Sequence, residues 1–161
     1  FWEERNIWFS DVWMDIKGAS QSLSDKNSRS RSAAYPFEVA YRLINMFSVK
    51  DDVVLDPFLG TGTTTIAAIA SGRNSFGFEI DPGLGDIFSS FKNNIVSFSN
   101  EYILSRITRH LDFLENYLKT NGPLKHTNKH YGFPVVAGQE REMLINNLEA
   151  VKSLEDNTLA V

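Results

Sequence analysis

The sequence VVLDPFLGTGTT, which occupies residues 53–64, decides the fold. Its first three residues are apolar and predict a short buried strand. Gly60 and Gly62 allow the backbone of the following turn to approach another molecule closely. A helix is expected over residues 63–71, directly after the turn. Because backbone N–H groups at the positive end of a helix attract polar and negative groups, this stretch is a candidate binding turn.

A second strand and a preceding helix extend this pattern on both sides. Residues 75–80 read SFGFEI and predict a strand, while Pro36 suits the first turn of an amphipathic helix over residues 36–48. Two strand–helix units in sequence indicate an α/β fold with a parallel sheet and flanking helices, here a partial Rossmann-like fold. A doubly wound sheet needs more than two strands. Either this chain contains further strands that the sequence pattern does not identify, or its two strands are part of a larger sheet.

The remaining segments are expected to surround this core within a single domain of 161 residues. The aromatic-rich start, residues 1–19, predicts a short strand or an irregular packed segment. A long helical region is expected over 84–119 with an interruption near 97–100, then an extended piece over 133–136 and a last helix over 139–154. The domain is divided into an aromatic segment with a polar loop (1–30), a core with the binding turn (31–81) and a mainly helical C-terminal part (82–161).

Composition narrows the class of protein. Hydrophobic residues make up 42% and charged residues 22% of the chain, which is ordinary for a globular domain. No apolar run approaches the ~20 residues that a membrane span needs, and cysteine is absent, so a disulfide framework and a thiolate metal site are excluded. The lack of cysteine is consistent with a protein of the cytoplasm. The net charge of −4 counts against a nucleic-acid-binding surface over the whole domain, so a basic face must be local or supplied by another segment or partner.

The residues around the turn select among nucleotide-like ligands. A dinucleotide site needs a third glycine where this chain has Thr65, which disfavours a nicotinamide-dependent oxidoreductase. A phosphate-binding loop needs a lysine after the turn, and none occurs between Lys50 and Lys92. S-adenosylmethionine carries a carboxylate and a nucleoside but no phosphate, so it meets both restrictions.

A carboxylate at the end of the second strand supports the same ligand. Glu79 follows Asp56 by about one strand–helix unit, and an acidic residue at this place in nucleoside-binding α/β folds accepts hydrogen bonds from ribose hydroxyls. Phe58 and Ile80 could flank an adenine ring. Taken alone, the turn is more often a plain connection, and Glu79 could be a solvated strand end. Their combination with the Asp56–Pro57 pair favours ligand binding.

This combination resembles the amino-methyltransferases of bacterial and archaeal restriction–modification systems, in their permuted beta class. Residues 56–64 look like the family's first cofactor motif, residues 73–81 look like its second, and residues 31–38, RSAAYPFE, look like the companion motif that runs along the methionine of the cofactor. The resemblance implies a site-specific DNA methyltransferase that uses S-adenosylmethionine. The implied cofactor-binding residues are Ala34, Tyr35, Pro36, Phe37, Asp56, Pro57, Phe58, Gly60, Thr61, Gly62, Thr63, Thr64, Glu79 and Ile80.

The resemblance also implies a catalytic motif that the chain lacks. Members of the family hold the flipped target base with a Ser/Asp/Asn-Pro-Pro-aromatic segment, whereas the five prolines of this chain are all isolated. In the beta class that segment precedes the position of residue 31, so we expect it upstream of Phe1 or on another chain, and we assign no catalytic residue here. The alternative is a catalytically silent S-adenosylmethionine-binding module of a split enzyme. The flanks at 8–13 and 125–135 resemble members that methylate the cytosine amino group, which favours cytosine N4 over adenine N6.

Other polar and aromatic residues have weaker functional interpretations. Arg31, Lys125 and Lys129 could contact the phosphates of double-stranded DNA, although a solvated loop is the plainer interpretation of the two lysines. His126 and His130 have no carboxylate near them in the sequence, so no metal site is expected. The three tryptophans are expected in the core rather than stacked on bases. A sheet edge left open by missing strands would favour a homo-oligomer.

Overall fold

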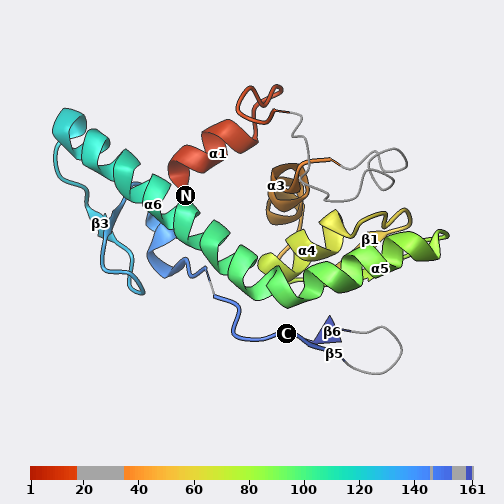
Figure 1. Cartoon of the computed structure of the whole chain (residues 1–161). Coiled ribbons are helices and arrows are strands. Elements are labelled where there is room, and N and C mark those ends of the chain that lie inside the picture. Colours follow the sequence, from red (N-terminus) through yellow and green to blue (C-terminus); the bar gives the residue numbers. More distant parts are fainter. Residues whose placement is uncertain (18–34, 146, 154–158, 161) are drawn as a thin grey trace. The chain divides into compact units, whose positions relative to one another are not determined.

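The computed structural model describes residues 1–17, 35–145, 147–153 and 159–160 (Figure 1). The chain separates into two compact units. Unit 1 combines residues 1–13 with 100–147, and unit 2 combines residues 14–99 with 148–161. Each unit is therefore built from segments far apart in the sequence. The three-part division of a single domain stays a prediction.

Unit 2 contains the predicted strand–turn–helix. Strand β1 (Val53–Asp56) precedes helix α4 (Thr63–Ala70) and strand β2 (Asn74–Gly77). The two strands are parallel, and their register runs from Val53 opposite Asn74 to Asp56 opposite Gly77. This unit confirms the α/β class and the partial Rossmann-like arrangement. Strand β2 begins and ends earlier than predicted, so Glu79 lies two residues beyond its end.

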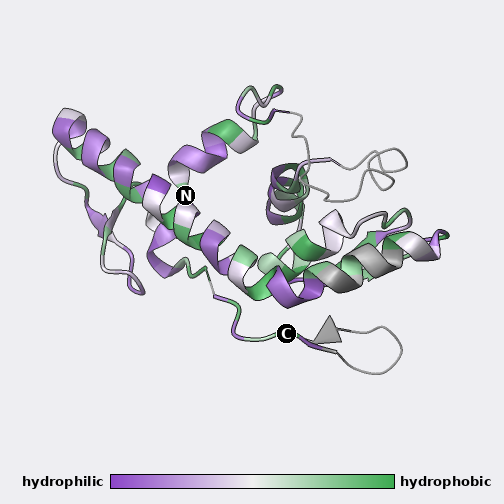
Figure 2. Ribbon diagram, in the orientation of Figure 1, coloured by the Kyte–Doolittle hydropathy of each residue, from purple (hydrophilic) through white to green (hydrophobic). Residues whose placement is uncertain are grey.

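The core of unit 2 lies beneath α4. All five residues from Ile66 to Ala70 are buried, because this part of the helix consists of alanines and isoleucines, which are coloured green in Figure 2. Helix α3 (Phe37–Phe47), close to the predicted 36–48, packs against α4. The residues of the core cluster come from several elements: Ile66, Ile69 and Ile95, surrounded by Phe37, Phe88, Phe91, Phe98, Leu148 and Val151.

The long helical region after β2 is interrupted earlier than predicted. It consists of α5 (Pro82–Phe91), a 3-10 turn η1 (Lys92–Asn94) and α6 (Ile95–Asn121). Asp81 caps α5, since its carboxylate accepts a hydrogen bond from the Gly83 amide at 2.9 Å. The predicted break near 97–100 is absent, since α6 is continuous through these residues. The Ser97 hydroxyl donates locally to the Asn94 carbonyl at 3.1 Å.

Unit 1 begins with a helix where a strand or irregular segment was predicted. Helix α1 (Trp2–Trp8) presents Glu3 and Glu4 to the part of α6 that lies in unit 1. The Glu3 carboxylate lies 2.7 Å from Nδ1 of the fully buried His110, and both carboxylate oxygens of Glu4 accept hydrogen bonds from Arg106, at 2.5 and 2.7 Å. These partners are more than 100 residues away in the sequence, so local patterns could not indicate the helix.

The tryptophan side chains follow the predicted packing only in part. Trp8 is buried, while Trp2 keeps 36% of its surface exposed. Trp2 lies beside the rings of Phe113 and Tyr117, at centroid distances of 6.0 and 6.1 Å. The guanidinium of Arg106 lies 4.9 Å from the ring of Trp8, where the negative face of an aromatic ring attracts a cation.

The predicted last helix over 139–154 is wrong. The described residues of this segment form a 3-10 turn, η2 (Gly138–Glu142), and strand β5 (Lys152–Ser153), which pairs antiparallel with β6 (Leu159–Ala160). Asn128 and Tyr131 explain the difference. The Asn128 amide donates to the carbonyls of Glu140 and Met143 at 2.7 and 2.8 Å, and the Tyr131 hydroxyl bonds both main-chain groups of Ile145. These side chains take up groups that a helix would pair internally.

A short hairpin holds Asn128 in place. Strand β3 (His126–Thr127) pairs antiparallel with β4 (Pro134–Val135), which confirms the extended piece predicted over 133–136. The Asn128 side-chain oxygen accepts from the amides of His130 and Tyr131, at 2.9 and 3.0 Å. One buried side chain therefore organises both the hairpin turn and the segment after it.

Candidate functional site

The glycine turn is held in a conformation that its sequence requires. Gly60 and Gly62 have φ angles of 55° and 85°, in the left-handed region that glycine enters without steric cost. The Gly62 amide donates to the Leu59 carbonyl at 2.9 Å, and the Leu59 amide donates to the Phe78 carbonyl at 2.9 Å. The turn is thereby fastened to the chain that leaves β2. At the start of α4 the first amides have no partner within the helix.

Glu79 reaches back to this turn. One of its carboxylate oxygens accepts from the Gly60 amide at 2.7 Å, and the other accepts from the Asp81 amide at 2.8 Å. The hydrogen bonds from the amides of Asp81 and Gly60 lower the pKa of Glu79 below its ordinary value, so the group is a carboxylate at neutral pH. Each oxygen retains acceptor capacity. The two features that the sequence linked to one ligand, 19 residues apart, thus meet in the structure.

Two apolar side chains beside the glycine turn are exposed to solvent. Asp56 accepts a hydrogen bond from the Phe58 amide at 3.0 Å, which fixes the bend at Pro57. The side chains of Phe58 and Ile80 are 86% and 98% exposed. Neither is taken up by the core of unit 2, so both remain available to cover an apolar ring.

Helix α3 is tied to the first turn of α4. Tyr35 and Thr64 share a hydrogen bond between their hydroxyl groups, and Pro36 directly precedes α3 with a φ of −60°. The ring of Phe37, another predicted cofactor residue, is partly buried and packs against the core cluster, 4.9 Å from the ring of Phe98. The predicted cofactor residue Ala34 lies outside the described residues.

The threonines of the turn divide into two groups. Thr61 belongs to the turn itself, whereas Thr63 and Thr64 open α4. The hydroxyl of Thr65, where a dinucleotide site would have glycine, accepts a hydrogen bond from the Ser75 hydroxyl at 3.2 Å. Thr65 therefore joins α4 to β2.

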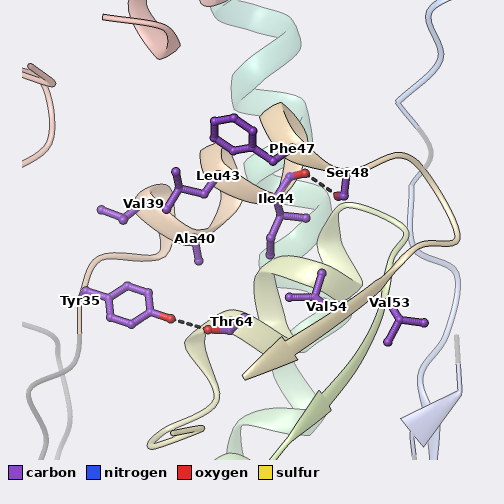
Figure 3. Close-up of a pocket in the computed structure, with 10 residues that line it drawn as sticks. All are labelled: Tyr35, Val39, Ala40, Leu43, Ile44, Phe47, Ser48, Val53, Val54 and Thr64. Atoms are coloured by element: carbon purple, nitrogen blue, oxygen red, sulfur yellow. Dashed lines mark hydrogen bonds between the residues drawn. The ribbon is translucent and has the colours of Figure 1, made fainter. Parts of the chain in front are cut away.

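A pocket of about 630 Å³ lies beside the turn, between α3 and β1. Figure 3 shows the bonded pair Tyr35 and Thr64 at one end of it. Gly60 and Glu79 are not among its lining residues. Sequence reasoning missed this pocket, because its walls are ordinary apolar positions of a helix and a strand. The lining residues are Tyr35, Val39, Ala40, Leu43, Ile44, Phe47, Ser48, Val53, Val54 and Thr64.

The structure describes two of the three residues that were predicted to contact DNA. Lys129 forms an ion pair with Glu142, while Lys125 is exposed. Arg31 lies outside the described residues. Among the residues that the structure describes, no group of three or more His, Asp or Glu side chains could hold a metal ion. None of the helices in those same parts of the chain is both long and apolar enough to cross a membrane.

Comparisons with known proteins find similarity to DNA methyltransferases. A family model described as DNA methylase matches residues 2–90, more than half of the chain. The type II methyltransferase M.MthZI of Methanothermobacter thermautotrophicus is 49% identical over 157 residues, which cover 98% of this chain and 43% of that protein. The type II methyltransferase M.MjaI of Methanocaldococcus jannaschii is 54% identical over 85 residues, covering 53% of this chain and 27% of that one.

A solved structure is also similar. It is described as a DNA modification methylase of Thermus thermophilus complexed with S-adenosyl-L-methionine, with 37% identity and a TM-score of 0.47. The match covers 60% of this chain and 33% of that one. The chain spans less than half the length of the curated relatives described above.

Proposed function

This chain belongs to the DNA methylase family, and we propose that it supplies the cofactor-binding part of a DNA amino-methyltransferase of a restriction–modification system. One observation carries the proposal: the Glu79 carboxylate and the glycine turn are joined through the Gly60 amide. This bond places an anionic acceptor beside a turn that opens a helix. A nucleoside bearing an amino acid matches that combination, because its ribose hydroxyls can donate to the carboxylate.

Each predicted cofactor residue has a separate task in this proposal. Glu79 receives the ribose hydroxyls, and Phe58 with Ile80 covers the adenine ring. The turn from Asp56 to Thr63 passes close to the nucleoside, and residues 34–37 with Thr64 border the methionine part. The exposure of Phe58 and Ile80 supports this fit, since no side chain of the unit 2 core covers them. Bound S-adenosylmethionine would supply an electrophilic methyl group on its sulfonium sulfur.

The reaction requires a base that has left the DNA stack. S-adenosylmethionine held by the glycine turn and Glu79 would supply the methyl group for a displacement, in which the exocyclic amino nitrogen of the base accepts it. Positioning dominates such a displacement. We propose cytosine N4 as the target rather than adenine N6, on the resemblance of residues 8–13 and 125–135 to cytosine-specific members.

DNA binding by this chain alone should be weak. The net charge is −4, and Lys129 pairs with Glu142 at the surface. The phosphate contacts proposed here are Arg31, Lys125 and Lys129. We further propose that the Pro-Pro-aromatic segment comes from another part of the enzyme or from a second chain, and that the complete enzyme acts on double-stranded DNA in the cytoplasm. We also propose that this chain can form a homo-oligomer.

Calorimetric titration with S-adenosylmethionine tests the proposal. The chain should bind the cofactor, and Glu79→Gln should weaken the affinity by about tenfold or more, because charge-assisted hydrogen bonds are lost. Glu101→Gln, on an exposed face of α6, is the matched control and should change nothing. Absence of binding by the natural chain, or equal affinities of the natural chain and Glu79→Gln, would overturn the assignment of the site.

A catalytically silent module is the second candidate, and the lack of a Pro-Pro pair in residues 1–161 favours it. Transfer of a labelled methyl group to DNA distinguishes the two. The chain alone should transfer none. If the chain still transfers none when it is combined with a polypeptide that carries the missing motif and associates with it, the silent module is the correct description.

A further inference from the structure

The side chain of Leu59, in the glycine turn, lies against Gly77, the last residue of strand β2. A Cβ atom at position 77 would lie 2.6 Å from Cδ1 and 3.0 Å from Cγ of Leu59. The φ angle of Gly77 lies outside the left-handed region, so its backbone conformation does not by itself require glycine. A glycine in a strand often marks the close approach of another segment, and here that segment is the glycine turn.

Main-chain hydrogen bonds also hold Leu59 to the end of β2. Its amide donates to the Phe78 carbonyl at 2.9 Å, and its own carbonyl accepts from the Gly62 amide at 2.9 Å. The Leu59 side chain is half-buried. One backbone bond and one side-chain contact therefore join Leu59 to the chain at the end of β2, and a change in either of them displaces the turn.

The residue after Leu59 donates the hydrogen bond on which the proposed site depends. The Gly60 amide donates to a carboxylate oxygen of Glu79 at 2.7 Å. Because a planar peptide bond joins Leu59 to Gly60, a displaced Leu59 backbone moves the Gly60 amide with it. Hydrogen bonds weaken steeply as the angle at the donor bends, so a small displacement is enough to weaken this one.

We propose that Gly77 is a positioning residue for the cofactor: its missing side chain admits Leu59, and Leu59 sets the place where the Gly60 amide meets the Glu79 carboxylate. The inference rests on the proposed function, which assigns Glu79 to the ribose hydroxyls. Gly77 acts through Leu59 and Gly60. Their contacts fix the direction of the remaining lone pairs of the carboxylate, and thereby the placement of the nucleoside.

The charge state of Glu79 depends on the same contacts. Hydrogen bonds from the amides of Asp81 and Gly60 lower the pKa of Glu79 below its ordinary value. Displacement of Gly60 removes one of these two donors, so the pKa of Glu79 should rise toward its ordinary value. A substitution at Gly77 therefore has an effect that can be measured without any cofactor.

Calorimetric titration with S-adenosylmethionine tests the positioning role. Gly77→Ala should weaken the affinity of the chain by about fivefold or more, because the added methyl group forces Leu59 away from β2. Gly138→Ala is the matched control. Its φ angle also lies outside the left-handed region, and an added Cβ would meet only ordinary contacts, 3.7 Å from Nε2 of His126, so this variant should bind the cofactor normally.

A second substitution distinguishes positioning from a general loss of structure. Leu59→Ala removes the side chain that the new methyl group would meet, so Gly77→Ala should have no further effect on affinity in the Leu59→Ala background. An equally large effect of Gly77→Ala in both backgrounds overturns the proposal, since Leu59 would then not transmit it. An unchanged affinity of Gly77→Ala in the natural background also overturns it, since Leu59 would then rotate aside without moving the turn.

The pKa of Glu79, followed by NMR of its side-chain carboxyl carbon, separates this inference from the proposed function. The pKa should be higher in Gly77→Ala than in the natural chain and should be the same in Leu59→Ala and the double variant. If the chain binds S-adenosylmethionine but neither its affinity nor this pKa responds to Gly77→Ala, the positioning role fails and the proposed function stands. If the pKa responds but the natural chain binds no cofactor, the proposed function fails, while Gly77 still positions the Glu79 carboxylate.

Discussion

Among the described residues, unit 1 buries more polar and charged side chains than unit 2, in which Arg42 and Ser99 are buried. Unit 1 buries Arg106, His110, Asn128 and Glu140 and gives each of them partners within the unit. Unit 2 has a small core of isoleucines and phenylalanines but leaves Phe76 and other residues of its sheet largely exposed. Parallel sheets with an uncovered apolar face are uncommon in complete domains. Unit 1 therefore pairs most of its buried polar groups, although Oε2 of Glu3 and Nε2 of His110 have no hydrogen-bond partner among the described residues. Unit 2 instead exposes apolar residues of its sheet.

Removal of one buried charge from unit 1 should produce the largest change in stability. Arg106→Met leaves Glu4 without its bidentate partner, so the free energy of unfolding of unit 1 should fall by about 3–5 kcal/mol. All three tryptophans lie in unit 1, so tryptophan fluorescence during urea unfolding follows this unit selectively. Arg109→Met, at an exposed position one turn of α6 away, should cost far less. Equal losses in the two variants would contradict the role given to the buried pair.

A glycine substitution tests the tight packing of unit 2 around the turn. A Cβ atom at position 62 would lie 2.3 Å from Cδ2 of Phe88, and the φ of 85° adds strain. Gly62→Ala should therefore destabilise the chain by about 2–4 kcal/mol. Gly122 has a similar φ of 78° with open space around it, so Gly122→Ala should cost only about 1–2 kcal/mol of strain. Circular dichroism during urea unfolding measures both, and an equal cost would mean that Phe88 moves aside.

Acid should weaken unit 1 through Glu4. Burial alone would raise the pKa of this carboxyl, but the hydrogen bonds and charge of Arg106 outweigh burial and lower the pKa below 4.5. A lowered folded-state pKa stabilises the unit fully above 4.5, and that stabilisation is lost as pH falls through the folded value. The tryptophan-detected unfolding midpoint should decline below about pH 4.5. The decline should be shallower in Glu4→Gln, and parallel curves would contradict the assignment.

The smallest effect is expected at an exposed ion pair. Glu142 and Lys129 form a surface pair, with side chains 62% and 56% exposed, and such pairs contribute little to stability. Glu142→Gln should leave the unfolding midpoint unchanged. If Lys129 contacts DNA, the variant should bind duplex DNA slightly more tightly at low salt in the complete enzyme, as fluorescence anisotropy would detect. A clear loss of stability would show that unit 1 depends on surface charge as well.

The accuracy of sequence-based prediction differed between the units for a physical reason. In unit 2, α3, β1 and α4 follow from apolar spacing and from glycines whose φ angles are positive, which are local properties. In unit 1, α1 depends on the contacts of Glu3 and Glu4 with α6, and the non-helical backbone of the described residues after Glu142 depends on Asn128. The periodicity of apolar residues along a segment does not indicate partners that are so distant in the chain.

The candidate site was predictable to a similar degree. The proximity of Gly60 and Glu79 follows from the parallel pairing of two strands whose order the sequence indicated. The inward position of Phe37 and the pocket between α3 and β1 could not be predicted, because both depend on which face of α3 meets α4. Apolar residues on two faces of one helix give no indication of which face is covered.

The buried amide of Asn128 has a consequence for how samples of this protein age. Slow hydrolysis of that amide to a carboxylate, in stored material, would replace two N–H donors with lone pairs facing the carbonyls of Glu140 and Met143. The repulsion would release the hairpin and the segment behind it. Old preparations should therefore lose the tryptophan signal of a folded unit 1 while the glycine turn stays intact.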